Sequence, residues 1–227
     1  LYSSLMTVLD AGDEVLIPDP GWPNYESICH LAGARPVRYR LDPAAGYVPS
    51  IAEIERLTTS RTKAILINTP GNPTGAVFPE PLMRHIAEHV RAAGLYLISD
   101  EIYEDMVFEG AHASAAKYDI EDRLFVISGV SKSYAMTGFR LGFLICPPAL
   151  ATVAASLQEP ITSGASSPSQ KAAEAALTGD QSGVGTLCDT FRRRCEIFCD
   201  AMGPELLPVR PLGAFYALID ISTTGMR

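Results

Sequence analysis

Short apolar runs separated by helical patterns make up most of the chain. The runs are continuous and rich in β-branched residues, which is typical of strands buried on both faces of a sheet. Between them, apolar positions recur at helical spacing, as in residues 51–57 and 79–93. This alternation predicts an α/β fold with three layers: a mostly parallel sheet between helices. The predicted strands are residues 14–17, 36–40, 63–67, 95–99, 124–127 and 141–146.

After residue 147 the pattern becomes mainly helical. Helices are predicted at residues 149–157, 167–177 and 184–201, followed by a closing strand at residues 213–221. We place a domain transition within the longest helix. Residues 1–190 are then a large domain, and residues 191–227 begin a smaller C-terminal α+β domain. Both ends of the chain look cut, because it starts inside a helical pattern without a capping residue. We therefore expect a fragment.

Composition and charge narrow the function classes. The chain is 47% hydrophobic and 19% charged, which is typical of a soluble globular protein. Its 18 basic and 26 acidic residues give a net charge of −8, which argues against nucleic acid as a partner. Five scattered cysteines suggest reduced thiols and a cytoplasmic setting. The longest uncharged stretch, residues 141–158, contains two prolines, so no membrane span is expected.

Polar side chains follow three of the predicted strands. Asn72 lies in the turn after the third strand, and Asp100 and Tyr103 follow the fourth. Lys132 follows the fifth, in a stretch rich in glycine and serine. Because ligands bind beyond the carboxyl ends of parallel strands, we expect these side chains at one edge. A lysine among small residues there is placed to form a Schiff base with an aldehyde.

These residue types suit pyridoxal phosphate. A carboxylate at Asp100 would keep the pyridine nitrogen protonated, and Asn72 and Tyr103 would donate hydrogen bonds to the phenolic oxygen of the ring. Lys132 would form the aldimine and later move a proton as general base. Arg140, eight residues further on, offers a planar, permanently charged fork for the phosphate.

Two further residues complete the candidate site. The Ser131 hydroxyl would assist at the phosphate, and Trp22, the only tryptophan, would stack on the flat cofactor after the first strand. Simpler readings exist, since Trp22 could be core packing and Asp100 a helix N-cap. Residues 85–89 fit an H-x-x-E-H pattern, but no third ligand is evident, so we expect no metal site.

The chain resembles the class I/II aminotransferases, the fold-type I pyridoxal phosphate enzymes, from residue 12 to about residue 220. The resemblance implies a seven-stranded, mostly parallel sheet with one antiparallel strand, a smaller second domain, and a homodimer with sites at its interface. It also implies that Lys132 carries the cofactor. The resemblance rests on three motifs: Pro70-Gly71-Asn72-Pro73-Thr74-Gly75, Ser99-Asp100-Glu101-Ile102-Tyr103, and Ser131-Lys132 through Gly138-Phe139-Arg140-Leu141-Gly142.

Two departures from the family pattern concern the site. Three residues before the lysine, where many relatives have Ser or Thr for the phosphate, this chain has Gly129. Ser131 or Ser128 is then the candidate substitute. Family members also carry a phosphate-gripping loop before Leu1 and a C-terminal domain with a substrate-binding arginine. Turnover by this chain alone is therefore not assumed.

The resemblance implies a transaminase that moves an amino group from an α-amino acid to a 2-oxo acid through a Lys132 aldimine. A β-lyase or synthase on the same scaffold is an alternative, because the cofactor site does not fix which bond breaks. Another is an aminotransferase-like domain that senses an effector in a transcription regulator, and a third is a remnant that binds nothing. The sequence does not decide which amino acid would be the donor.

Overall fold

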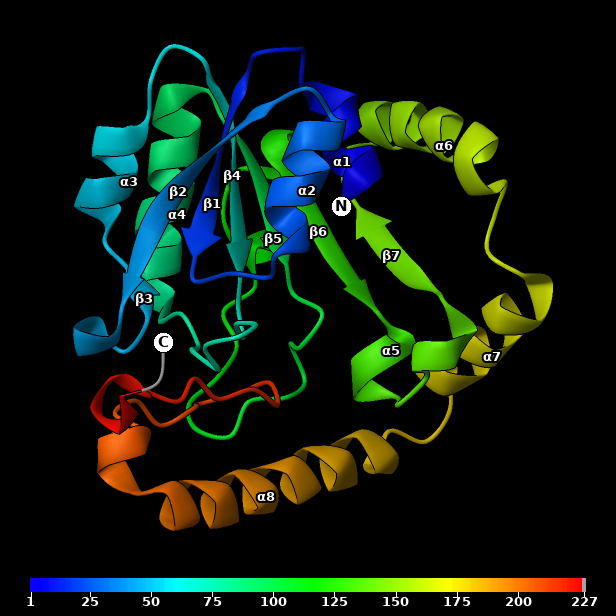
Figure 1. Ribbon diagram of the computed structural model, residues 1–227. Coiled ribbons are helices and arrows are strands. Elements are labelled where there is room, and N and C mark those ends of the chain that lie inside the picture. The colour runs from blue at the N-terminus through cyan, green and yellow to red at the C-terminus, as the bar shows by residue number, and fades with distance from the viewer. Residues whose placement is uncertain (226–227) are drawn as a thin grey trace.

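The computed structural model describes residues 1–225 and contains one seven-stranded sheet. The strands are β1 (Glu14–Asp19), β2 (Arg35–Asp42), β3 (Val48–Pro49), β4 (Thr62–Asn68), β5 (Tyr96–Asp100), β6 (Leu124–Gly129) and β7 (Gly142–Ile145). Their order is β3-β2-β1-β4-β5-β6-β7 (Figure 1). The five from β2 to β6 are parallel, and both edge strands are antiparallel to their neighbours. The predicted fold class is confirmed, with two antiparallel strands instead of one.

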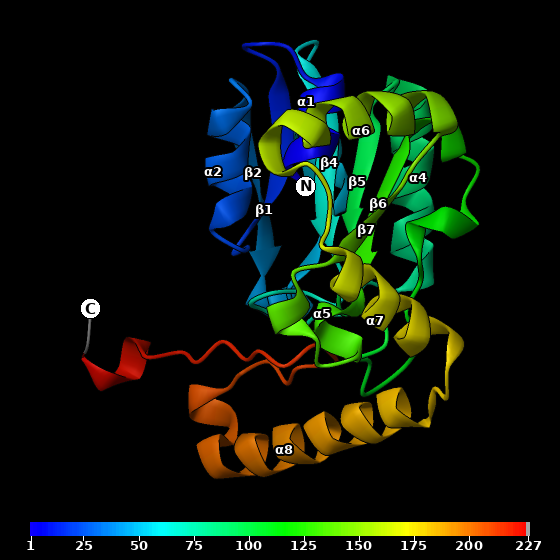
Figure 2. The same ribbon diagram turned by 90° about the vertical axis from the view of Figure 1, so that its right-hand side faces the viewer.

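The helices cover both faces of this sheet. Figure 2, which views the molecule from the side, shows α2 on one face and α4 on the other, and the buried cores place α1 with α2 and α3 with α4. Three-layer packing of this kind buries both faces of a parallel sheet. The helices are α1 (Tyr2–Val8), α2 (Asn24–Leu31), α3 (Ile51–Leu57), α4 (Glu80–Ala93), α5 (Val130–Ser133), α6 (Pro148–Thr162), α7 (Ser167–Thr178) and α8 (Ser182–Leu206).

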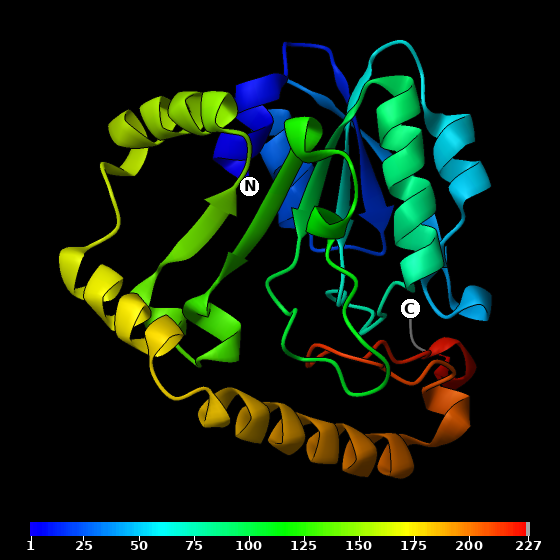
Figure 3. The same ribbon diagram turned by 180° about the vertical axis from the view of Figure 1, so that it is seen from behind.

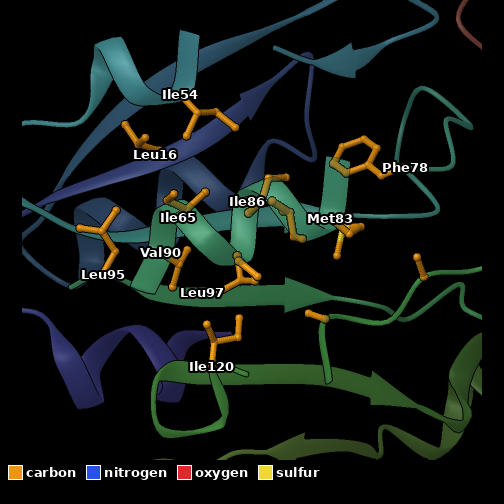
Figure 4. Packing of buried hydrophobic residues seen from close by; sticks show 14 of the residues in the cluster. Leu16, Ile54, Ile65, Phe78, Met83, Ile86, Val90, Leu95, Leu97 and Ile120 are labelled. Carbon is orange, nitrogen blue, oxygen red and sulfur yellow. The ribbon is translucent and has the colours of Figure 1, made fainter. Parts of the chain in front are cut away.

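Two apolar cores form because successive residues of a strand point to opposite faces. In β4, Ile65 and Ile67 belong to the core under α3 and α4, whereas Leu66 belongs to the core under α1 and α2. The first core also contains Met83 and Ile86 of α4 (Figure 4). The continuous apolar runs of the sequence follow from this arrangement, because both kinds of position are buried.

The closing strand predicted at residues 213–221 is wrong. After α8 the chain returns beneath the carboxyl edge of the sheet, between that edge and the helix (Figure 3). In the described part of the chain, this segment forms only an isolated antiparallel bridge, between Val107 and Gly213. Its partners are loops, not strands, so no ladder continues. The boundary near residue 190 falls inside the helical run of α8 and stays a prediction.

Candidate functional site

The carboxyl ends of the parallel strands lie at one edge, as the sequence predicts. Trp22 follows β1, Asn72 follows β4, Asp100 ends β5, and Lys132 lies in α5 directly after β6. The strand order reverses between β1 and β4. In open α/β sheets such a switch point is where ligands bind.

Asp100 is a buried carboxylate at the centre of this edge, with 5% of its surface exposed. The Tyr25 hydroxyl donates a hydrogen bond to its Oδ2 at 2.7 Å, and the Ile102 backbone N–H donates to Oδ1 at 3.3 Å. Burial raises the pKa of Asp100, although these two hydrogen bonds oppose that shift. A buried carboxylate of this kind is stabilised by a cationic partner such as a protonated ring nitrogen.

Asn68 connects Asp100 to the loop that carries Asn72. Its Nδ2 donates to the Asp100 carbonyl oxygen at 2.9 Å, and its Oδ1 accepts from the Asn72 backbone N–H at 2.7 Å. The side chain is buried, so both of its polar ends are satisfied within the protein. It therefore fixes the position of Asn72 relative to the end of β5.

Lys132 and Tyr103 face each other across the same edge. Lys132 Nζ lies 5.8 Å from the centroid of the Tyr103 ring and 5.5 Å from that of Phe215. Among the described residues, this amine makes no hydrogen bond or ion pair. Burial and the contact with the Tyr216 hydroxyl raise the pKa of Tyr103 above its ordinary value, and the nearby Asn72 amide acts in the opposite direction. The site thus combines an unpaired amine with a phenol and an amide.

Trp22 joins this set through Tyr25. The two rings make an edge-to-face contact with centroids 5.4 Å apart. Trp22 is half-buried and packs at the border of the core under α1 and α2. A continuous series of contacts therefore links Trp22 through Tyr25 to Asp100, and from there through the Asn72 loop to Tyr103 and Lys132.

Ser131 and Arg140 are not linked to this series within the described residues. Ser131 is half-exposed in α5. Arg140 is exposed, and its Nη1 donates to the Thr137 carbonyl oxygen at 2.9 Å. Its φ of 51° is in the left-handed region that non-glycine residues rarely adopt. The proposed phosphate contacts of both residues stay predictions.

Gly129 lies where β6 and β7 approach closely. A β-carbon there would lie 2.8 Å from Gly142 Cα and 3.1 Å from the Leu141 carbonyl oxygen. Both contacts are with backbone, so this arrangement of the strands has no room for a serine. The nearby Ser128 hydroxyl donates to Glu104 at 2.5 Å and is thus already engaged. Of the two serines considered for the phosphate, Ser131 is the one that makes no hydrogen bond within the described structure.

A cavity of about 890 Å³ is lined by Arg140 and Ser128, but by none of the residues in the series of contacts. Its walls come from α6, α7, β7 and the start of α1, and Lys132, Asp100 and Asn72 do not line it. We place the site at the strand ends, because the chemical groups gather there and the cavity is lined mainly by small and apolar side chains.

Glu101 holds the Asp100–Tyr103 segment in place through hydrogen bonds of its side chain. It is fully buried and accepts hydrogen bonds from Ser99 Oγ at 2.8 Å and the Ala115 N–H at 2.9 Å, and it contacts His112 Nε2 at 2.9 Å. Burial opposes its charge, but these bonds outweigh that effect and lower its pKa below the ordinary 4.5. The carboxylate thereby ties the loop of residues 101–115 to the sheet.

Replacing Glu101 by glutamine is expected to lower the free energy of unfolding at pH 7 by about 3 kcal/mol, because a buried, fully bonded charge is lost. A lowered folded-state pKa contributes stability above pH 4.5 that disappears as pH falls through the folded value. The difference between wild type and variant should therefore shrink in acid. Urea unfolding between pH 7 and pH 3 measures this. Exposed Glu80→Gln is the matched control, and an equal loss in both variants would contradict the assignment.

Three residues of the site were not assigned a role from the sequence. Tyr25 lies at the start of α2, three residues after Trp22, and Asn68 ends β4, four residues before Asn72, so their polar side chains near the strand ends were a signal. Tyr216 lies in the wrongly predicted closing strand, and its hydroxyl is 2.8 Å from that of Tyr103. Nothing in its sequence neighbourhood points to the site, because the contact spans 113 positions.

The fold and the site together define a class: an α/β domain with a lysine, a carboxylate, an amide and a phenol at the carboxyl edge of its sheet. The sequence profile described as "Aminotransferase class I and II" matches residues 1–226. The chain belongs to this family. The resemblance inferred from the three motifs is therefore confirmed.

Named relatives agree with this placement. The chain is 35% identical over 226 residues to a probable aspartate/prephenate aminotransferase of Thermus aquaticus, covering 98% of this chain and 59% of that protein. It is 34% identical to an arginine–pyruvate transaminase of Pseudomonas aeruginosa, covering 100% and 58%. An aromatic aminotransferase structure from Pyrococcus horikoshii superposes with a TM-score of 0.95 at 33% identity, covering 99% and 62%. The chain spans about three fifths of the length of these relatives.

Proposed function

We propose that the protein is a pyridoxal phosphate-dependent aminotransferase that moves an amino group from an α-amino acid to a 2-oxo acid. This proposal rests on the series of contacts from Trp22 to Lys132 at the carboxyl edge of the sheet. The names of relatives support amino transfer over the lyase and sensor alternatives, since they include transaminases with different donors.

The residues present fit the cofactor. Asp100 is a buried carboxylate with a raised pKa and no cationic side chain bound to it within the described residues. Lys132 offers an amine without an ion-pair partner, and Tyr103 and Asn72 offer donors beside it. When bound, pyridoxal phosphate supplies an aldehyde that condenses with amines and a ring that withdraws electrons.

Each side chain then has a defined task. Lys132 would hold the aldehyde and move the proton of the substrate α-carbon, because an amine at this position is a suitable general base. Asp100 would keep the ring nitrogen protonated, and the Tyr25 hydroxyl orients this carboxylate. Tyr103 and Asn72 would donate to the phenolic oxygen, and Trp22 would pack on the ring.

Other parts of the proposal concern the phosphate and the assembly. Ser131 and Arg140 are proposed to bind the phosphate, which a planar guanidinium and a hydroxyl suit. We also propose the boundary between residues 1–190 and 191–227, and a homodimer with its sites at the interface. No helix in the described part of the chain is long and apolar enough to cross a membrane.

The proposal is tested by adding pyridoxal phosphate to the purified chain and recording the visible spectrum. A Schiff-base band, followed by borohydride reduction and peptide mapping, is expected to place the label on Lys132. Aspartate, arginine and aromatic donors are then tested with added 2-oxo acids, alongside assays for released pyruvate and ammonia. Release without transfer would favour a lyase, and a folded chain without a band would contradict cofactor binding by this chain.

A further inference from the structure

Tyr216 belongs to the segment that returns beneath the sheet after α8. Its hydroxyl lies 2.8 Å from the Tyr103 hydroxyl, and the two rings are perpendicular with centroids 5.6 Å apart. Tyr103 is 97% buried in the chain, whereas Tyr216 is half-buried. Tyr216 is thus the nearest hydroxyl to the phenol that faces Lys132.

The backbone fixes this position. Leu212 N–H donates to the Gly75 carbonyl oxygen at 2.8 Å, and Ala214 N–H donates to the Met106 carbonyl oxygen at 2.8 Å. A β-carbon on Gly75 would lie 2.9 Å from the Tyr216 carbonyl oxygen, so the two backbones are in close contact. The segment is therefore held against the loop after β4 and the loop after β5, which both carry site residues.

The direction of the phenol–phenol hydrogen bond decides what Tyr103 can do. A phenol has one proton to donate. Within the described residues either hydroxyl could be the donor, but a Tyr103 that gave its proton to Tyr216 would have none for a ligand. If Tyr103 instead donates to the phenolic oxygen of the bound ring, as proposed above, its one proton is committed, and Tyr216 is then the donor of this hydrogen bond.

We propose that Tyr216 is a positioning residue: its hydroxyl donates to Tyr103 and directs the Tyr103 proton toward the phenolic oxygen of the bound ring. This inference rests on the proposed function. Donation by Tyr103 stabilises the negative charge of that oxygen, which then holds the Schiff-base proton less firmly. The returning C-terminal segment thereby tunes the protonation of the site without touching the cofactor.

The first test needs no cofactor. Tyr216→Phe keeps the ring and its packing and removes only the hydroxyl. In protein labelled with 13C at the tyrosine ζ-carbon, the Tyr103 resonance, assigned by its loss in Tyr103→Phe, is expected to move. Tyr118→Phe is the matched control, because it also loses one phenol hydrogen bond, to the Glu80 carbonyl oxygen, on the exposed surface. An unmoved Tyr103 resonance in Tyr216→Phe would overturn the inference.

The second test is the pH titration of the Schiff-base band. The midpoint is expected to rise by about 0.7 pH unit in Tyr216→Phe, the shift that corresponds to one ordinary hydrogen bond, and to stay in place in Tyr118→Phe. A midpoint that is unchanged or lower would overturn the positioning role even if the resonance moves. Absence of the band in the unmodified chain would instead refute the proposed function, while the NMR result would still report on the contact itself.

Discussion

Replacing Lys132 by alanine is expected to abolish the Schiff-base band that pyridoxal phosphate gives with the chain. The chain has only four lysines, and the contacts place Lys132 alone beside Tyr103 and Phe215. Loss of a general base by itself costs about 10²- to 10⁴-fold in rate, and loss of the covalent anchor adds to this. Any amino-transfer rate should therefore fall by at least that factor. Visible absorbance before and after borohydride reduction measures the band directly.

Folding should be unaffected, since the Lys132 amine makes no hydrogen bond or ion pair within the described residues. Circular dichroism of the variant checks this. Lys171→Ala is the matched control: that lysine is exposed and pairs with Glu174 at 2.6 Å, far along the chain from the site. It should keep the full band. A band of normal intensity in Lys132→Ala, with label on another lysine, would mean that the nucleophile is misassigned.

The sheet could be predicted because its inner strands, such as β4 and β5, are buried on both faces. All six strands predicted from the apolar runs are present, and their ends differ by at most two residues. The ladder extends past the apolar run where polar residues pair, as Asn68 and Asp100 do between β4 and β5. The two-residue strand β3 was not predicted, because two residues carry no period.

The closing segment could not be predicted because its environment is made by other parts of the chain. The apolar residues from 214 to 219 suggested a strand, yet Phe215, Ile219 and Ile221 are exposed in this chain. The segment bonds to loop carbonyl groups, not to a neighbouring strand. The local sequence pattern does not indicate such a distant partner. The absence of a strand here and the position of Tyr216 beside Tyr103 are therefore seen only in the structure.

The site was predictable to the extent that it follows from topology. Residues placed after parallel strands necessarily meet at one edge, and Trp22, Asn72, Asp100 and Lys132 do so. Which groups bond to them depends on loop geometry that the sequence does not specify. The hydrogen bond from Tyr25 to Asp100 spans 75 positions and is an example.

Replacing Asp100 by asparagine is expected to reduce amino transfer by about 10³-fold while the Schiff-base band still forms. The amide lacks the charge that keeps the ring nitrogen protonated, so electron withdrawal by the ring weakens although Lys132 is untouched. The asparagine side chain is nearly the same size as that of aspartate, and the Tyr25 hydroxyl can still donate to the amide oxygen. The two readouts should therefore separate: a band in the spectrum, little transfer in the assay. Loss of both would indicate that Asp100 is needed for folding or binding instead.

A graded control comes from the residue behind the carboxylate. Tyr25→Phe keeps the ring that packs on Trp22 and removes only the hydroxyl that donates to Asp100. Loss of such an orienting partner costs about 10- to 100-fold, less than loss of the charge itself. Combining the two changes should cost little more than Asp100→Asn alone, because Tyr25 acts through the carboxylate. Additive losses in the double variant would show that Tyr25 acts on the reaction by another route.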